Sequence, residues 1–400
     1  MPDETPAPEP VAAPEAPHHE SPRRKRKQKL PTWTHPGLYV GARLGAAAIN
    51  LMGPEPAMRV MRRLGELAVT LPKVRSRVDK AMENISWCFP TWERQTVREY
   101  AIESHRHLFC LAAELALTPR LWSRDGYATR IEFGEMSRAI RSMCDERPCI
   151  LITGHTGNWE LLGTTLAGLG FNMHALYRPL DITPLNDWLH EARSRHGIDL
   201  VDKFGAAEVL PRLLHAGEPV GFIADQNAGD RGIFVPFFNR LASAYKTIGL
   251  LAMQHEATVL CGHARRLSGL SAGTGDPTRS QAVRESQIFR YRIDIVDHFG
   301  PSEWRHHPDP LFYITARYRR AIEAMIRRAP EQNLWMHRYW KSRPPHERRG
   351  SAFPAQLREK IAALPWIDDD DVEQIVERSS LDARALHGAA RPHRAARAGS

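Results

Sequence analysis

Between residues 149 and 297, short apolar segments alternate with longer amphipathic segments, and this alternation restricts the chain to few folds. The run Cys149 to Ile152 is too short for a helix and rich in β-formers, so it predicts a buried strand. Further strands are predicted at Phe171 to Leu176, Ile198 to Val201, Pro219 to Ile223, Thr258 to Ala264 and Phe289 to Asp297, the last two paired. Strands that alternate with helices form a mostly parallel sheet flanked by helices. We therefore predict a mixed α/β fold.

The first strand leads into a glycine-rich turn that carries His155. Gly154 and Gly157 permit a tight strand-to-helix turn, and a helix is predicted from near Asn158 to Gly170. On one helix, His155 and Glu160 would lie about 140° apart, so they converge only if His155 precedes the helix. A histidine there is suited to act as a general base that Glu160 orients. A polar turn followed by a carboxylate that favours the helix dipole explains the same residues without catalysis.

Polar clusters follow two more predicted strands. Tyr177, Arg178 and Asp181 follow the second strand, and Asp225 and Gln226 follow the strand at Pro219 to Ile223, with Arg231 and Gly232 shortly after. The carboxyl ends of parallel strands meet at one edge of the sheet, where α/β proteins bind their ligands. We therefore expect one crevice there.

The N-terminal region has the pattern of a membrane anchor. Residues 1–30 are expected to be a disordered tail that ends in a basic block, Arg23 to Lys29. Aromatic residues follow, and then an apolar stretch from Val40 to Met52 that is shorter than the ~20 residues a span requires. For residues 31–55 we predict a membrane-associated helix lying in the cytoplasmic face of the bilayer. A tilted span, with Arg43 reaching the interface, is the alternative.

Composition narrows the class of protein further. A mean hydropathy of −0.43 excludes a polytopic membrane protein. The net charge of +9 favours an anionic partner. The five cysteines lack metal-type spacing, so free thiols in a reducing compartment are expected. Residues 56–148 are predicted to be helical and to pack on a core formed by residues 149–345. Within this core, residues 267–285 are predicted to form a loop insertion. Residues 346–400 are predicted to form a tail that is peripheral to the core.

The order of these motifs resembles the bacterial lipid A biosynthesis lauroyl/myristoyl acyltransferase family, within the glycerolipid acyltransferase superfamily. The resemblance rests on residues 154–160 (GHTGNWE), 177–180 (YRPL), the Asp225-Gln226 pair, 232–238 (GIFVPFF) and 334–344 (LWMHRYWKSRP). It implies an inner-membrane enzyme, on the cytoplasmic face, that moves an acyl chain from acyl carrier protein onto a hydroxyl of a lipid A precursor. No cofactor, metal or nucleic acid is expected to take part.

The resemblance assigns His155 and Glu160 as the catalytic pair and Arg178 to oxyanion or phosphate binding. Asn158, Asp225, Gln226, Arg231 and Gly232 are the other residues expected at the substrate site. Residues 233–238 are expected either to line an acyl groove or dip into the bilayer, or simply to pack in the core. Cys149 is expected inside a strand, which disfavours a cysteine acyl-enzyme.

The sequence is also compatible with three alternatives. The acceptor can instead be a glycolipid mannoside, an ornithine-type lipid or a lysophospholipid. A membrane-docked lipid-binding protein without catalysis is a second alternative, although the intact His155 and Glu160 argue against it. A nucleic-acid binder, suggested only by the charge and the basic block, is the weakest.

Overall fold

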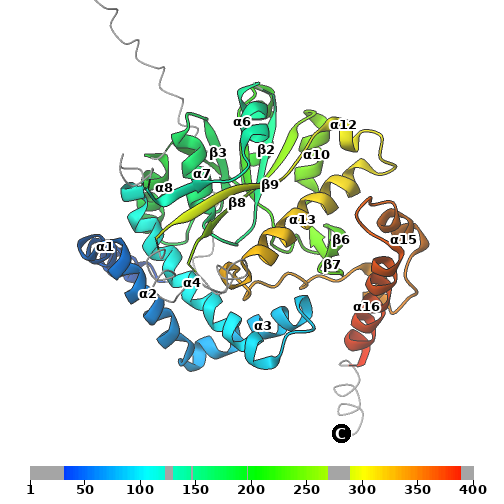
Figure 1. Cartoon of the computed structure of the whole chain (residues 1–400), viewed down its shortest axis with the longest axis horizontal. Coiled ribbons are helices and arrows are strands. Elements are labelled where there is room, and N and C mark those ends of the chain that lie inside the picture. The colour runs from blue at the N-terminus through cyan, green and yellow to red at the C-terminus, as the bar shows by residue number, and fades with distance from the viewer. Residues whose placement is uncertain (1–30, 122–128, 146, 196, 269–288, 389–400) are drawn as a thin grey trace, which may run out of the picture.

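The fold is described from a computed structural model covering residues 31–121, 129–145, 147–195, 197–268 and 289–388 (Figure 1). The predicted basic tail and almost all of the predicted 267–285 insertion lie outside these residues.

A seven-stranded sheet forms the centre of the molecule, in the order β1-β9-β8-β2-β5-β3-β4. Its strands are β1 (Ile131–Phe133), β2 (Cys149–Thr153), β3 (Met173–Tyr177), β4 (Ile198–Asp202), β5 (Val220–Ile223), β8 (Thr258–Arg266) and β9 (Tyr291–Phe299). All neighbouring pairs are parallel except β8 and β9, which pair with each other as predicted and run antiparallel. The predicted mostly parallel α/β sheet is confirmed.

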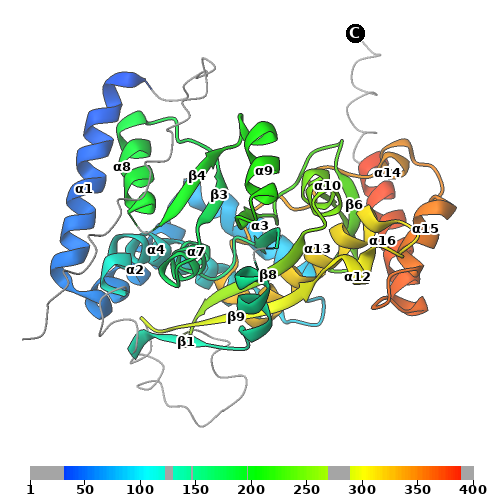
Figure 2. The ribbon, with the colours of Figure 1, turned by 90° about the horizontal axis from the view of Figure 1, so that it is seen from above.

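Helices cover both faces of this sheet (Figures 1 and 2). They are α6 (Ser137–Cys144), α7 (Trp159–Gly168), α8 (Thr183–Ser194), α9 (Ala206–His215), α10 (Lys246–Gln254), α12 (Pro301–Trp304) and α13 (Pro310–Arg328). Alternate residues of each strand point to opposite faces. Ile150 and Ile152 of β2 therefore join one core with α9, α10 and α13, whereas Cys149 and Leu151 join the other with α6 and α7.

The N-terminal residues form the short 3-10 turn η1 (Thr32–Thr34) and four helices. The helices are α1 (His35–Met52), α2 (Pro54–Val69), α3 (Pro72–Cys88) and α4 (Arg94–Leu121). Gly53, with a φ of 80°, separates α1 from α2, and Pro54 begins the second helix. Within the described parts of the chain, every helix is too short or too polar to cross a bilayer. The membrane-associated helix expected at residues 31–55 remains a prediction.

Residues 233–244 form a β-hairpin that was not among the strands predicted from the sequence. β6 (Ile233–Phe237) pairs antiparallel with β7 (Arg240–Ala244), and α10 begins only at Lys246. The two turn residues, Phe238 and Asn239, both have positive φ, as a two-residue hairpin turn requires. Phe234, Val235, Phe237 and Phe238 are buried in the main core. Of the two roles considered for this segment, core packing is the one the structure supports.

The C-terminal residues that were expected to be peripheral pack against the core. They form α14 (Pro345–Arg349), α15 (Ala355–Ala362) and α16 (Asp369–Gly388), with η3 (Pro330–Gln332) preceding them. Ile361, Leu364, Val372 and Ile375 are buried. Asp382 of α16 accepts hydrogen bonds from Arg240 and Arg343, both of which are also buried. The polar character of this segment concealed an apolar face and a buried ion-pair cluster.

Candidate active site

The turn after β2 holds His155 through contacts made by its neighbours. The N–H of Gly157 donates to the carbonyl of Gln332 (2.9 Å), the N–H of Asn158 to that of Ala264 (2.6 Å), and the N–H of Leu334 to that of His155 (3.0 Å). Gly157 has a φ of 60°, and a Cβ there would lie 2.2 Å from the Ala264 carbonyl oxygen. Only glycine fits this position, as the sequence suggested.

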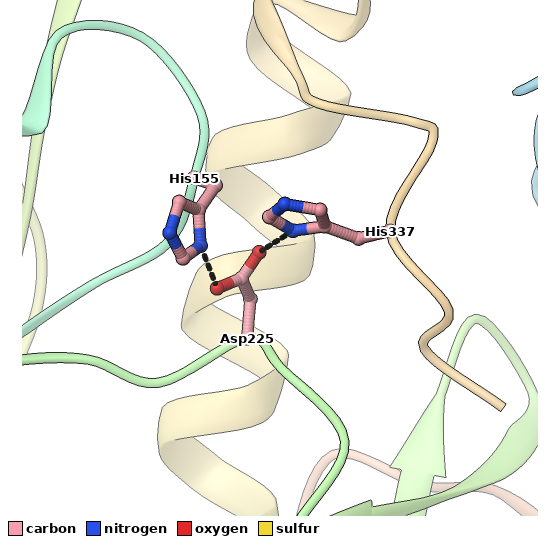
Figure 3. Close-up of side chains that lie close together, drawn as sticks. All are labelled: His155, Asp225 and His337. Atoms are coloured by element: carbon pink, nitrogen blue, oxygen red, sulfur yellow. Dashed lines mark hydrogen bonds and ion pairs between the residues drawn. The ribbon is translucent and has the colours of Figure 1, made fainter. Parts of the chain in front are cut away.

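Asp225 is the carboxylate that holds the imidazole of His155. The His155 Nδ1 lies 2.7 Å from Asp225 Oδ1, and Asp225 is fully buried at the end of β5 (Figure 3). Burial alone would raise the pKa of Asp225, but the neighbouring His155, together with His337, outweighs burial and keeps that pKa well below its usual range. An ionised Asp225 fixes the proton of His155 on Nδ1 and leaves Nε2 as the basic nitrogen.

His337 completes a cluster that sequence reasoning missed. Its Nδ1 lies 3.6 Å from Asp225 Oδ2, and its ring is 4.5 Å from that of His155 between centroids. Figure 3 shows the carboxylate of Asp225 between the two imidazoles. The only sequence signal was its place in the 334–344 motif, which carried the family resemblance but no assigned role.

The ligand atoms of His155, Asp225 and His337 lie within 4.8 Å of one another and are of types that zinc accepts. The two Nδ1 atoms already face the Asp225 oxygens as hydrogen-bond and ion-pair partners. A metal ion would have to replace both contacts. The absence of a metal from the reaction remains a prediction.

Glu160 does not hold His155 in this structure. Its carboxylate forms a two-pronged ion pair with Arg193 of α8, with Arg193 Nε 2.8 Å from Oε2. Glu160 is the second residue of α7, and that position directs it towards α8. The predicted convergence of His155 and Glu160 on each other is therefore replaced by two separate pairs, His155 with Asp225 and Glu160 with Arg193.

A cavity of about 650 Å³ opens beside His155. Of the predicted site residues, His155, Glu160, Arg178 and Gln226 line it. Asn158 has a different role: its side chain caps α7 by accepting from Leu161 N (2.9 Å) and donates to Glu114 (2.8 Å). Arg231 and Gly232 are not among the lining residues. A Cβ at Gly232 would lie 2.1 Å from the hydroxyl of Ser243 on β7, so the glycine allows the chain to pass close to the hairpin.

Comparison with known proteins identifies the family of the chain. The family described as bacterial lipid A biosynthesis acyltransferase matches residues 24–272, more than half of the chain. The chain belongs to this acyltransferase family. It is 27% identical over 304 residues to the lipid A biosynthesis palmitoleoyltransferase of Escherichia coli, covering 75% of this chain and 90% of the relative. The same figures hold for a lipid A biosynthesis acyltransferase of Shigella flexneri.

A third relative is the lipid A biosynthesis lauroyltransferase of E. coli, 25% identical over 283 residues, which is 70% of this chain and 84% of the relative. The protein is therefore an enzyme, an acyltransferase.

A buried polar network of residues from α4, β8 and η3 holds the turn that carries His155 in this acyltransferase. Glu114 of α4 accepts from Asn158 through one oxygen and from Arg266 of β8 through the other (2.7 Å to Arg266 Nε). The side-chain amide of Gln332 accepts a hydrogen bond from the N–H of Arg266 and donates one to its carbonyl. The backbone carbonyl of Gln332 accepts from the N–H of Gly157. Three elements far apart in sequence therefore fix the position of His155.

The thiols of the acyltransferase offer no second nucleophile at this site. Cys149 lies inside β2, as predicted, and burial raises its pKa to about 12. All five cysteines are free, and Cys144 is the exposed one. A thiol with this pKa is protonated at neutral pH and unreactive.

Proposed function

We propose that this acyltransferase moves a fatty acyl chain from the thioester of acyl carrier protein to a hydroxyl of a lipid A precursor, with His155 as general base. The observation that carries the proposal is the 2.7 Å contact between His155 Nδ1 and buried Asp225 beside a cavity. This pair has the base-and-orienting-carboxylate arrangement used in acyl transfer.

In the proposed reaction, Nε2 of His155 takes the proton of the acceptor hydroxyl while its oxygen attacks the thioester carbonyl carbon. The tetrahedral intermediate then collapses, the carbon–sulfur bond breaks, and the thiolate leaves. The thiolate recovers the proton from His155, so no other acid is required. Asp225 stabilises the imidazolium that exists between these two proton transfers.

Negative charge develops on the carbonyl oxygen as the tetrahedral intermediate forms, and hydrogen-bond donors are needed to stabilise it. The amides of Gly157 and Asn158 already donate to the backbone, so they do not serve this role. The amides of Trp159 and Glu160 begin α7, where a helix leaves its first N–H groups without helical acceptors. Exposed Arg178 at the cavity is the proposed cationic partner of the oxyanion or of a substrate phosphate. Glu160 is proposed to act beside it by holding Arg193 at the cavity wall.

We place this reaction at the cytoplasmic face of the inner membrane. Large apolar side chains are exposed on α1 and α2, namely Leu38, Val40, Leu44, Leu51, Met52, Val60, Leu64 and Leu67. The net charge of +9 favours both anionic lipid headgroups and an acidic carrier protein. Helix α1 also packs on α8, which walls the cavity, with Arg43 over the ring of Trp188 at 5.4 Å. A membrane-bound acceptor would thus meet the site directly.

The proposal is tested by acyl transfer with the purified chain, acyl carrier protein thioesters and lipid A precursors. We expect His155→Ala to lower kcat/KM at least about 100-fold, as for loss of a general base. The matched control is His215→Ala, at an exposed position on α9, which should keep the wild-type rate. A His155→Ala variant that folds and keeps wild-type activity would overturn the mechanism. If the wild type transfers no acyl chain to any lipid A precursor, the proposed acceptor is wrong.

A further inference from the structure

The cavity beside His155 exists because three small residues occupy positions where a helix normally packs on a sheet. The strand register aligns Leu151 of β2 with Gly221 of β5, Gly221 with Ala175 of β3, and Ala175 with Leu200 of β4. Residues aligned in this way share one face of the sheet. The two central positions of the row carry a hydrogen and a methyl group, and Gly163 of α7 also lines the space.

This space continues along the strands away from the catalytic edge. Its lining includes Tyr177 at the carboxyl end of β3, and also Met173 and Ile198 at the amino ends of β3 and β4. Tyr177 lies four residue steps beyond Met173, which corresponds to roughly 13 Å along a strand. The inner lining residues are apolar: Leu151, Leu162, Leu166, Met173, Ile198 and Leu200. Arg178 and Lys203, which also line the space, directly follow the carboxyl ends of β3 and β4.

A deep apolar slot that begins at the base suits a hydrocarbon chain whose reactive carbonyl stays at the mouth. With carbon–carbon bonds of about 1.5 Å in a zigzag, ~13 Å accommodates roughly ten carbons. Each methylene that leaves water strengthens binding about fourfold, so the depth of such a slot selects among chain lengths.

We propose that this cavity holds the acyl chain of the donor, and that Gly163, Ala175 and Gly221 keep it open while Met173 and Ile198 close its inner end. The inference rests on the proposed function and adds the residues that set the donor chain length. In the proposed reaction the acceptor hydroxyl lies at His155 Nε2 and the donor carbonyl lies next to that hydroxyl. The donor chain is chosen for the slot because its reactive carbonyl is the end of the chain, so the whole chain can extend from the base into the slot.

The structure indicates which substitutions fill the slot without disrupting the fold. A Cβ on Gly221 would lie 3.5 Å from the His174 carbonyl oxygen, which is ordinary contact. A Cβ on Gly163 would lie 3.3 Å from Cδ1 of Ile198, a flexible side-chain end. Gly163→Ala and Gly221→Ala therefore shorten or narrow the slot, and Met173→Ala lengthens it. Gly45→Ala, on α1 with no atom within 4 Å of its Cβ, is the matched control.

The test is a competition assay in which the full chain receives a mixture of saturated acyl carrier protein thioesters, from octanoyl to stearoyl, with one acceptor. We expect Gly163→Ala and Gly221→Ala to shift the preferred donor to a shorter chain. The ratio of kcat/KM for the wild-type optimum to that for the shorter chain should fall about tenfold. Met173→Ala should shift preference to longer chains, and Gly45→Ala should leave the profile unchanged.

Other outcomes separate this inference from the proposed function. If the variants slow transfer of all donors equally, or change only the KM of the acceptor, the cavity does not hold the donor chain, although the acyl transfer stands. If the wild type transfers no donor to the acceptor, the proposed function itself fails. Thermal unfolding of each variant confirms that the comparison is made between folded proteins.

Discussion

At the scale of single residues, the carboxylate nearest to His155 in the sequence is not the one that contacts its imidazole. Glu160 lies five residues after His155 but pairs with Arg193. Asp225 lies seventy residues away and contacts the imidazole. The lowered pKa of Asp225 keeps it ionised at every pH at which the enzyme is expected to work. The two carboxylates are therefore expected to contribute to catalysis in different ways.

A double-mutant cycle distinguishes them. We expect Asp225→Asn to lower kcat at least about 100-fold, because the neutral amide neither fixes the tautomer nor stabilises the imidazolium. Combined with His155→Ala, it should cause little further loss, since residues that act as a unit are not additive. The effect of Glu160→Gln should instead add to that of His155→Ala. The reverse pattern, with Glu160 non-additive and Asp225 additive, would show that Glu160 orients the base.

At the scale of elements, the catalytic turn depends on α4, β8 and η3 as much as on β2 and α7. Glu114 is fully buried, and its two oxygens serve Arg266 and Asn158. The attraction of Glu114 and the other nearby groups raises the pKa of Arg266 further above its ordinary value even though burial would lower it, so the guanidinium stays charged. Such a pair is costly to break from one side, because the remaining charge is left without a partner.

We predict that Glu114→Gln lowers the free energy of unfolding by about 3 kcal/mol, because Arg266 stays buried without its counter-charge. The control is Glu191→Gln, which removes the exposed ion pair with Arg195 and should change stability by less than about 1 kcal/mol. Urea unfolding followed by circular dichroism measures both. Equal effects of the two substitutions would mean that the buried network does not stabilise the fold.

At the scale of the whole molecule, the helices α1 and α2 lie at one end and α16 lies at the other (Figure 2). Exposed apolar side chains occur at both ends, but α1 and α2 together expose more of them than α16. Apolar surface of this extent, beside a basic segment of sequence, is typical of proteins that bind membranes.

We predict that Leu44→Glu combined with Leu64→Glu weakens binding to vesicles of anionic phospholipid at least about tenfold, since two charges would enter the apolar side of the bilayer interface. Leu381→Glu, on α16, is the matched control: its exposure of 45% is close to the 44% of Leu64. Co-sedimentation with vesicles gives both affinities. Equal binding by both variants and the wild type would place the membrane surface elsewhere.

Much of the fold followed from local patterns. The strand, turn and helix around His155 were predicted because Gly157, Asn158 and Gly170 act on the backbone within a few residues. The β6–β7 hairpin was missed because its turn uses Phe238 and Asn239 rather than a glycine. The helices after residue 345 were missed because their charged residues, Asp382 among them, form ion pairs inside the protein.

The sequence by itself determined the family, the parallel sheet and the place of the histidine, since short-range periodicity and motif order carry that information. Only the tertiary structure decided which groups meet there. Asp225 reaches His155 because β2 and β5 are neighbours in the sheet, and His337 reaches both from a loop near the C-terminal region. The cavity likewise depends on Gly163, Ala175 and Gly221 being stacked by helix packing and strand register. Contacts between distant segments are fixed by packing, and no local pattern encodes them.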